Sequence, residues 1–170
     1  NEISNAFSEW EREGNLMFSE TAESPNIVIN FVKNNKNESM EYGKKYVVAY
    51  TEPKIAGDIL DGMNINFYIQ DPEGKNFTRN QIYNTALHEI FHALGFMGHS
   101  FEPDNIMYLA KDNNAIANDT RESLTEADTS TLQLLYKIKP DVTNSSVLKS
   151  EYVPYLVLGD DEELNSSKAR

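Results

Sequence analysis

The sequence centres on one stretch, His88-Glu89-Ile90-Phe91-His92-Ala93-Leu94-Gly95-Phe96-Met97-Gly98-His99, which contains all 3 histidines of the 170-residue chain. Residues four positions apart lie on the same face of a helix, so His88 and His92 can direct two imidazoles at one ion. Glu89 lies about 100° around the helix from His88, beside such an ion, where it can hold a water without being a ligand. The pattern predicts a helix that carries two metal ligands and a general base.

The residues that follow the helix can supply a third ligand. A straight helix cannot bring another side chain to the same point, so the chain has to turn back. Gly95 can adopt the left-handed backbone conformation that such a turn requires, and His99 follows it as the expected third ligand. Three imidazoles with one open position are typical of a catalytic zinc site. The chain has no cysteine for a closed structural site.

A further motif follows His99. An acidic, proline-containing link at 101–104 separates the pair His99-Ser100 from Asn105-Ile106-Met107-Tyr108. Together with the H-E-x-x-H helix, this arrangement resembles the metzincin clan of zinc peptidases, and within that clan the matrixins, the matrix metalloproteinase type. The resemblance implies that the Met-turn residue Met107 lies under the zinc as a hydrophobic floor.

The position of His99 departs from the usual metzincin spacing. The third histidine normally stands three residues after the glycine, where this chain has Gly98, and His99 comes one residue later. Gly98 has no side chain to bind a metal, and it lets the turn absorb the extra residue, so His99 is retained as the ligand. The alternative is a carboxylate from downstream, Glu122 or Glu126, as in other H-E-x-x-H enzymes.

The resemblance implies a zinc-dependent endopeptidase that hydrolyses peptide bonds of protein substrates. It assigns one catalytic Zn²⁺ to His88, His92 and His99, and a zinc-bound water that Glu89 activates. No histidine remains for the second zinc of animal matrixins. Two alternatives stay open: a catalytically inactive, zinc-containing peptide-binding domain, and a different H-E-x-x-H hydrolase with a carboxylate ligand.

The composition bounds the partners of the chain. A net charge of −12 argues against nucleic acid or an anionic membrane as the partner, because both attract basic surfaces. No apolar run approaches the length of a membrane span. Without cysteine there is no disulfide, and no thiol of the kind that silences many matrixin zymogens. We expect a monomer with a protein or peptide substrate, and the resemblance implies an extracellular or cell-surface location.

Local patterns outline the fold. Apolar spacing predicts a helix over 3–13, and alternating or β-branched segments predict strands over 16–21, 26–32, 46–51 and 63–69, the third ending before Pro53. Capping boxes place helix starts at Thr78 and Thr125. The expected class is α+β, zincin-like, with a twisted, mostly parallel sheet, an antiparallel edge strand, an active-site helix and a C-terminal helix.

The domain boundaries follow from the same comparison. We expect a matrixin-like catalytic domain over 1–139 that lacks the family's first strand, and an extension or linker over 140–170. The chain starts at Asn1 without a signal-peptide pattern, so a processed or trimmed product is expected.

Three further assignments come from the resemblance or from local composition. The strand at 46–51 corresponds to the family's cleft-lining edge strand, so Val47, Val48, Ala49 and Tyr50 could pair with an extended substrate, although a plain solvent-facing edge strand reads the same way. Asp128 is implied to support the Met-turn through a hydrogen bond to its backbone. Asp58 and Asp61 in a glycine-containing loop could hold Ca²⁺, but solvated acids are the commoner explanation, since calcium needs six or more oxygens.

Overall fold

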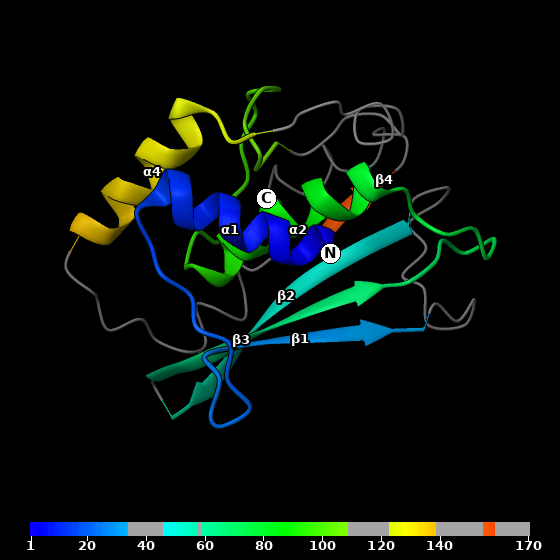
Figure 1. Ribbon diagram of the computed structural model, residues 1–170, viewed down its shortest axis with the longest axis horizontal. Helices are drawn as coiled ribbons and strands as arrows, with labels where there is room; N and C mark the ends of the chain where they lie inside the picture. The colour runs from blue at the N-terminus through cyan, green and yellow to red at the C-terminus, as the bar shows by residue number, and fades with distance from the viewer. Residues whose placement is uncertain (34–45, 58, 109–122, 139–154, 159–170) are drawn as a thin grey trace, which may run out of the picture.

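The computed structural model describes residues 1–33, 46–57, 59–108, 123–138 and 155–158 (Figure 1). Its elements, in chain order, are α1 (Glu2–Gly14), β1 (Ile27–Val32), β2 (Tyr46–Ala56), β3 (Ile59–Tyr68), α2 (Arg79–Ala93), α4 (Glu126–Lys137) and β4 (Tyr155–Leu158). In Figure 1, α1 and α2 lie together on one side of the sheet, and α4 lies beside the end of α1. The expected α+β class is confirmed.

The sheet has the strand order β1-β3-β2-β4. Strands β1 and β3 pair in parallel, whereas β2 is antiparallel both to β3 and to β4. The sheet is therefore mixed rather than mostly parallel, and the antiparallel direction of β2 is as expected. The difference arises because 16–21, an expected strand, forms none, and because β4 adds a second antiparallel pair. Since β4 lies beyond β2, β2 is not the expected edge strand.

The segment after α1 packs by its side chains instead of pairing in the sheet. Leu16 and Phe18 lie against the hydrophobic core, and the Phe18 ring meets the Phe7 ring edge-on at 4.8 Å between centroids. The backbone N–H of Phe18 donates to the Glu11 carboxylate at 2.8 Å, so a side chain takes the place of a strand partner. The predicted strand at this position is wrong.

Two strands are longer than expected. β2 continues through Pro53, which lies opposite Met63, to Ala56. Proline is tolerated where one side of a strand has no ladder partner, and the pairing of β4 with β2 runs only from Tyr46 to Tyr50. β3 begins at Ile59, so Asp61 lies in a strand rather than in the expected calcium-binding loop, and Asp58 is outside the described residues.

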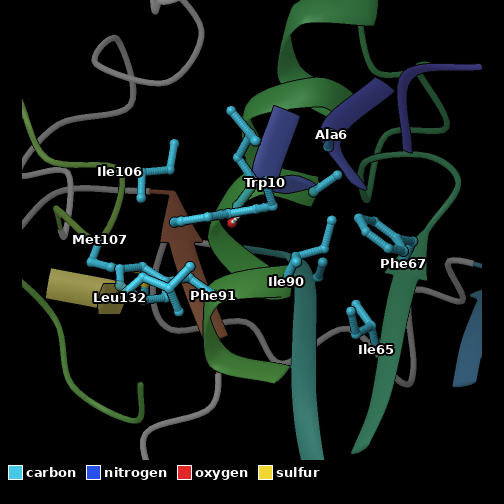
Figure 2. Packing of buried hydrophobic residues seen from close by; sticks show 12 residues of the cluster. Ala6, Trp10, Ile65, Phe67, Ile90, Phe91, Ile106, Met107 and Leu132 are labelled. Carbon is cyan, nitrogen blue, oxygen red and sulfur yellow. Dashed lines mark hydrogen bonds between the residues drawn. The ribbon is translucent and has the colours of Figure 1, made fainter. Parts of the chain in front are cut away.

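The core lies between the sheet and the two helices above it. Trp10 of α1 is fully buried, its indole Nε1 donates to the carbonyl of Leu87 at 3.0 Å, and its ring centroid lies 4.7 Å from that of Phe91. Figure 2 shows Trp10 reaching from α1 toward Ile90 and Phe91 of α2. Because a buried indole N–H needs an acceptor, this contact sets α1 at one position along α2.

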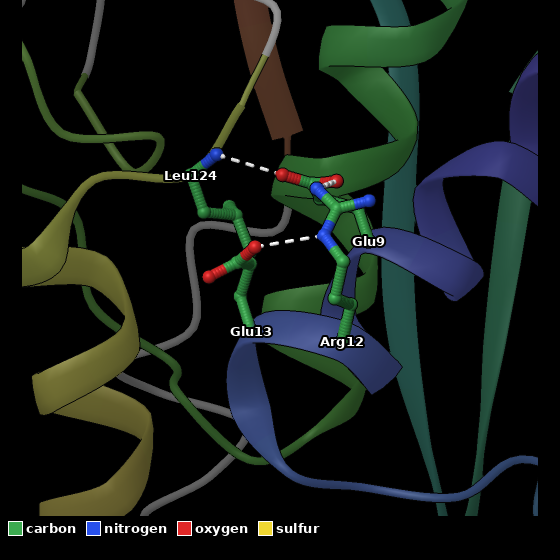
Figure 3. A network of polar contacts seen from close by, with 4 residues as sticks. All are labelled: Glu9, Arg12, Glu13 and Leu124. Atoms are coloured by element: carbon green, nitrogen blue, oxygen red, sulfur yellow. Dashed lines mark hydrogen bonds and ion pairs between the residues drawn. The ribbon is translucent and has the colours of Figure 1, made fainter.

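The helix starts are those that the capping boxes predicted. Thr78 and Gln81 cap α2 reciprocally, and Thr125 and Asp128 do the same for α4. A polar network ties α1 to the segment before α4 (Figure 3). Its centre is the buried Glu9, which pairs with Arg12 and accepts a hydrogen bond from the N–H of Leu124 at 3.3 Å.

Candidate metal centre

Three histidines converge at the C-terminal end of α2. His88 and His92 lie on the last turns of the helix and are buried. The chain then reverses at Gly95, whose φ of 107° lies in the region that favours glycine, and His99 returns to the other two. One ligand atom from each histidine lies within 4.8 Å of the others, as the spacing predicted.

The backbone orients two of the imidazoles. His88 Nδ1 lies 2.8 Å from the carbonyl oxygen of Ile106, and His92 Nδ1 lies 2.7 Å from that of Phe96. A carbonyl oxygen can only accept, so each Nδ1 carries the hydrogen, and each Nε2 presents a lone pair. Second hydrogen bonds of this kind fix the tautomer and the ring orientation of histidine ligands in metal sites.

The separation of His88 and His99 fits a tetrahedral ion, while the three ligand atoms as a group lie within 4.8 Å of one another. The Nε2 atoms of His88 and His99 are 3.3 Å apart, and two ligands about 2.0–2.1 Å from a tetrahedral zinc would be separated by about 3.3 Å. Burial lowers the pKa of His92 to about 4, while its hydrogen bond to Phe96 acts in the opposite direction. His92 is therefore neutral at physiological pH, which is the form that binds a metal.

Glu89 lies next to this cluster with its two carboxylate oxygens in different surroundings. Oε2 accepts a hydrogen bond from the hydroxyl of Thr51 at 2.7 Å, whereas Oε1 is buried and has no hydrogen-bond partner among the described residues. Burial raises the pKa of Glu89 to about 8, and the Thr51 hydrogen bond opposes that rise. A carboxylate held on one side and unpaired on the other can take up and release a proton near neutral pH.

Thr51 is a site residue that the sequence analysis missed. It lies on β2, fully buried, and its hydroxyl also lies 3.1 Å from the backbone carbonyl oxygen of Glu89. The alternation of a strand gives Ala49 and Thr51 one common face, so this pattern could have identified a polar group turned toward the helix. It could not have shown which residue the hydroxyl meets.

Backbone hydrogen bonds connect the turn around Met107 to His88 and to the residue after His99. Asp128 accepts a hydrogen bond from the N–H of Ile106 at 2.9 Å, and the carbonyl of Ile106 is the acceptor for His88. The N–H of Ser100, the residue after His99, donates to the carbonyl of Met107 at 2.7 Å, and the Met107 side chain is buried in the core. Asp128 and the turn thus reach both His88 and His99 through backbone groups.

Of the two carboxylates considered as alternative ligands, the structure describes only Glu126, which does not join the cluster. Glu126 is an exposed residue in the first turn of α4 and does not belong to the group of metal-ligating side chains found in the described part of the chain. Glu122 is outside the described residues.

The candidate substrate strand lies beside this site. Val47, Val48 and Ala49 are buried and Tyr50 is partly buried. Thr51, the next residue along β2, is the one that contacts Glu89.

Three imidazoles, an adjacent buried carboxylate and a methionine-containing turn define the class of zinc-dependent hydrolases. Comparison with family models agrees: the model described as Matrixin matches residues 1–137. The chain belongs to the matrixin family, and membership supports zinc binding and metallopeptidase activity. No curated protein matches the chain. Within the described residues, no helix is long and apolar enough to cross a membrane.

Proposed function

We propose that this protein is a zinc-dependent endopeptidase that cleaves peptide bonds in protein substrates. The observation that carries the proposal is the pairing of a three-histidine cluster with Glu89, a carboxylate that Thr51 holds by one oxygen only. A merely structural zinc site has four protein ligands and needs no such base.

Each residue of the site has a distinct role in the proposed reaction. His88, His92 and His99 would hold the ion, which when bound supplies Lewis acidity for the peptide carbonyl and for the attacking water. Glu89 accepts the proton of that water through Oε1 while Oε2 remains on Thr51. It then donates the proton to the leaving amine, a double role that a pKa near neutrality favours.

The substrate class follows from the strand beside the site. An extended peptide can add to the outer edge of β2, along Val47–Tyr50, through backbone hydrogen bonds. Such binding recognises any extended chain, so protein substrates fit better than small molecules. We further propose, from the family, a secreted monomer; the acidic charge of −12 suits an enzyme that works on proteins rather than on nucleic acid.

Cleavage of a quenched-fluorescent peptide library tests the proposal. The unmodified protein, a chelator-treated sample and Glu89→Ala are compared. We expect cleavage by the first alone, with Glu89→Ala slower by roughly 10²–10⁴-fold, the usual contribution of a general base. A folded sample that carries one zinc and cleaves nothing would refute the enzyme. Peptide binding by that same sample would favour the inactive binding domain instead.

A further inference from the structure

The outer edge of β2 is already occupied by the chain itself. Strand β4 pairs antiparallel with it, placing Leu158 opposite Tyr46, Val157 opposite Val47 and Tyr155 opposite Tyr50. In Figure 1, β4 lies on the side of β2 that faces away from β3 and β1. The four-residue strand therefore covers the Tyr46–Tyr50 part of β2, the segment to which an extended substrate would add.

This edge of β2 lies close to the candidate metal centre. Tyr50, the partner of Tyr155, precedes Thr51, and the Thr51 hydroxyl lies 2.7 Å from the carboxylate of Glu89. β3 takes the opposite edge of β2 from Ala49 to Ala56. Any further strand that reaches the site along β2 therefore has to use the edge where β4 lies.

Two strands cannot share one edge. Each outward N–H or C=O group of β2 makes its ladder bond to one neighbouring strand, so β4 and a bound peptide exclude each other. The segment Tyr155-Leu156-Val157-Leu158 contains the strand-favouring residues Tyr155 and Val157 and carries no charge. Because it belongs to the same chain, its effective concentration at the edge is on the order of millimolar, comparable with that of a short tethered ligand.

We propose that residues 155–158 act as a built-in pseudosubstrate strand that competes with extended peptides for the outer edge of β2. The strand would compete with any extended peptide whose backbone can form the same ladder with β2. The competition with substrate rests on the proposed function, whereas the pairing of β4 with β2 does not.

The test uses the full chain with two substitutions, Leu156→Pro and Val157→Pro together. Successive N–H groups of a strand point to opposite sides, so one of the two prolines removes an N–H that faces β2. The matched control, Leu156→Thr with Val157→Thr, keeps both N–H groups and a strand-favouring residue at 157. Both are made in the unmodified protein and in Glu89→Ala, which is expected to bind peptide and to cleave it far more slowly.

Binding is measured by fluorescence anisotropy with an end-blocked, labelled peptide of sequence Tyr-Leu-Val-Leu. In the Glu89→Ala background, the proline variant should bind this peptide about tenfold more tightly than the parent, the effect of losing one or two net backbone hydrogen bonds in the competing strand. The threonine variant should bind like the parent. Equal affinity in all three proteins would overturn the inference.

Cleavage separates the two proposals. If the proline variant raises kcat/KM about tenfold for a library substrate, both stand. If the parent cleaves the substrate and the proline variant is no faster, the pseudosubstrate strand fails and the endopeptidase remains. If no variant cleaves but the proline variant binds peptide more tightly, the enzyme fails and the competing strand remains.

Hydrogen exchange on the unmodified chain gives a check that needs no variant to fold. Pairing predicts slowed exchange of amides on both sides of the ladder, in Tyr155–Leu158 and in Val47–Tyr50. Addition of excess Tyr-Leu-Val-Leu peptide should release the first group and keep the second protected. Exchange of Tyr155–Leu158 at the rate of an unstructured peptide would overturn the inference.

Discussion

The hydrogen bond from Thr51 gives the two carboxylate oxygens of Glu89 different surroundings. Thr51 is fully buried and donates to Oε2 at 2.7 Å, which leaves Oε1 as the oxygen that can take up a proton. Without the hydroxyl, the buried carboxylate would lose the hydrogen bond that opposes its desolvation in the described part of the chain. Thr51 is therefore a positioning residue for Glu89, and its removal should affect turnover more than substrate binding.

Thr51→Val replaces the hydroxyl by a methyl group of similar size. We expect kcat to fall about tenfold or more with KM nearly unchanged, because the lost hydrogen bond to a charged group is worth about 1.5–3 kcal/mol. Steady-state kinetics on a cleaved peptide measure the split. Thr51→Ser, which keeps the hydroxyl, should restore most of the rate. Equal losses in both variants would point to packing instead.

Glu89 should leave a pH signature in the stability of the metal-free protein. Its pKa rises from 4.5 to about 8 on folding, so its contribution is full below pH 4.5 and is lost as the pH rises through 8. The pKa of His92 falls from 6.5 to about 4, so its contribution is present above pH 6.5 and is lost as the pH falls through 4. The two effects oppose each other between pH 4.5 and 6.5.

Glu89→Gln isolates the first effect, because the amide stays neutral and His92 is common to both proteins. The free energy of unfolding of each metal-free protein is measured by urea titration. From pH 5 to pH 8, the value for the variant should rise relative to that of the parent by on the order of 2–4 kcal/mol. A difference that stays constant across this range would contradict a raised pKa for Glu89.

The N-terminus of α4 supports His88, the proposed metal ligand on α2. Asp128 accepts from the N–H of Thr125 at 2.9 Å and from its hydroxyl at 2.7 Å, which completes the capping box. The same carboxylate holds the N–H of Ile106, whose carbonyl orients His88. The Asp128 side chain thus caps α4 and holds the turn whose Ile106 carbonyl orients the His88 imidazole.

Asp128→Ala should lower the free energy of unfolding by about 2–4 kcal/mol, since a cap is lost and the Ile106 N–H is left buried without its acceptor. Zinc affinity should fall about tenfold, as when other supporting contacts to metal ligands are removed. Thr125→Ala is the matched control, because it weakens the cap but leaves the Ile106 contact. Equal zinc affinity in Asp128→Ala and the parent would rule out the link to His88. Chemical denaturation and chelator competition measure the two quantities.

The candidate metal centre is built from parts of the chain that packing also brings together. α2 contributes His88, His92 and Glu89, the turn after it contributes His99, β2 contributes Thr51, and α1 locks α2 through Trp10. A bound ion would add a cross-link between the end of α2 and the returning turn. The folded state should therefore depend on zinc.

Zinc removal should lower the thermal stability of the parent protein. Ligand binding to the folded state adds about 2.7 kcal/mol when the free ion is at 100 times its Kd, so chelation should reduce Tm by several degrees. His99→Ala should lose more than about 100-fold in zinc affinity, more than a supporting contact contributes, and show little further change with chelator. Glu126→Ala should behave like the parent. Zinc loss in Glu126→Ala with retention in His99→Ala would reverse the ligand assignment. Calorimetry and metal analysis give both readouts.

Short-range sequence patterns predicted several features of the fold and of the candidate site. The helical spacing of His88 and His92, the capping boxes at Thr78 and Thr125 and the reversal at Gly95 depend on residues a few positions apart, so they were predictable from the sequence. The metzincin resemblance then supplied the family, which the matrixin match over 1–137 confirms.

Other features depend on contacts between distant parts of the chain. Strand pairing joins residues far apart, so neither the extension of β2 past Pro53 nor the absence of a strand at 16–21 could be read from local alternation. The hydroxyl of Thr51 meets Glu89 across 38 positions, and β4 reaches β2 from the far end of the chain. Only tertiary packing determines such contacts, because their energy is gained after the chain has closed the intervening loops.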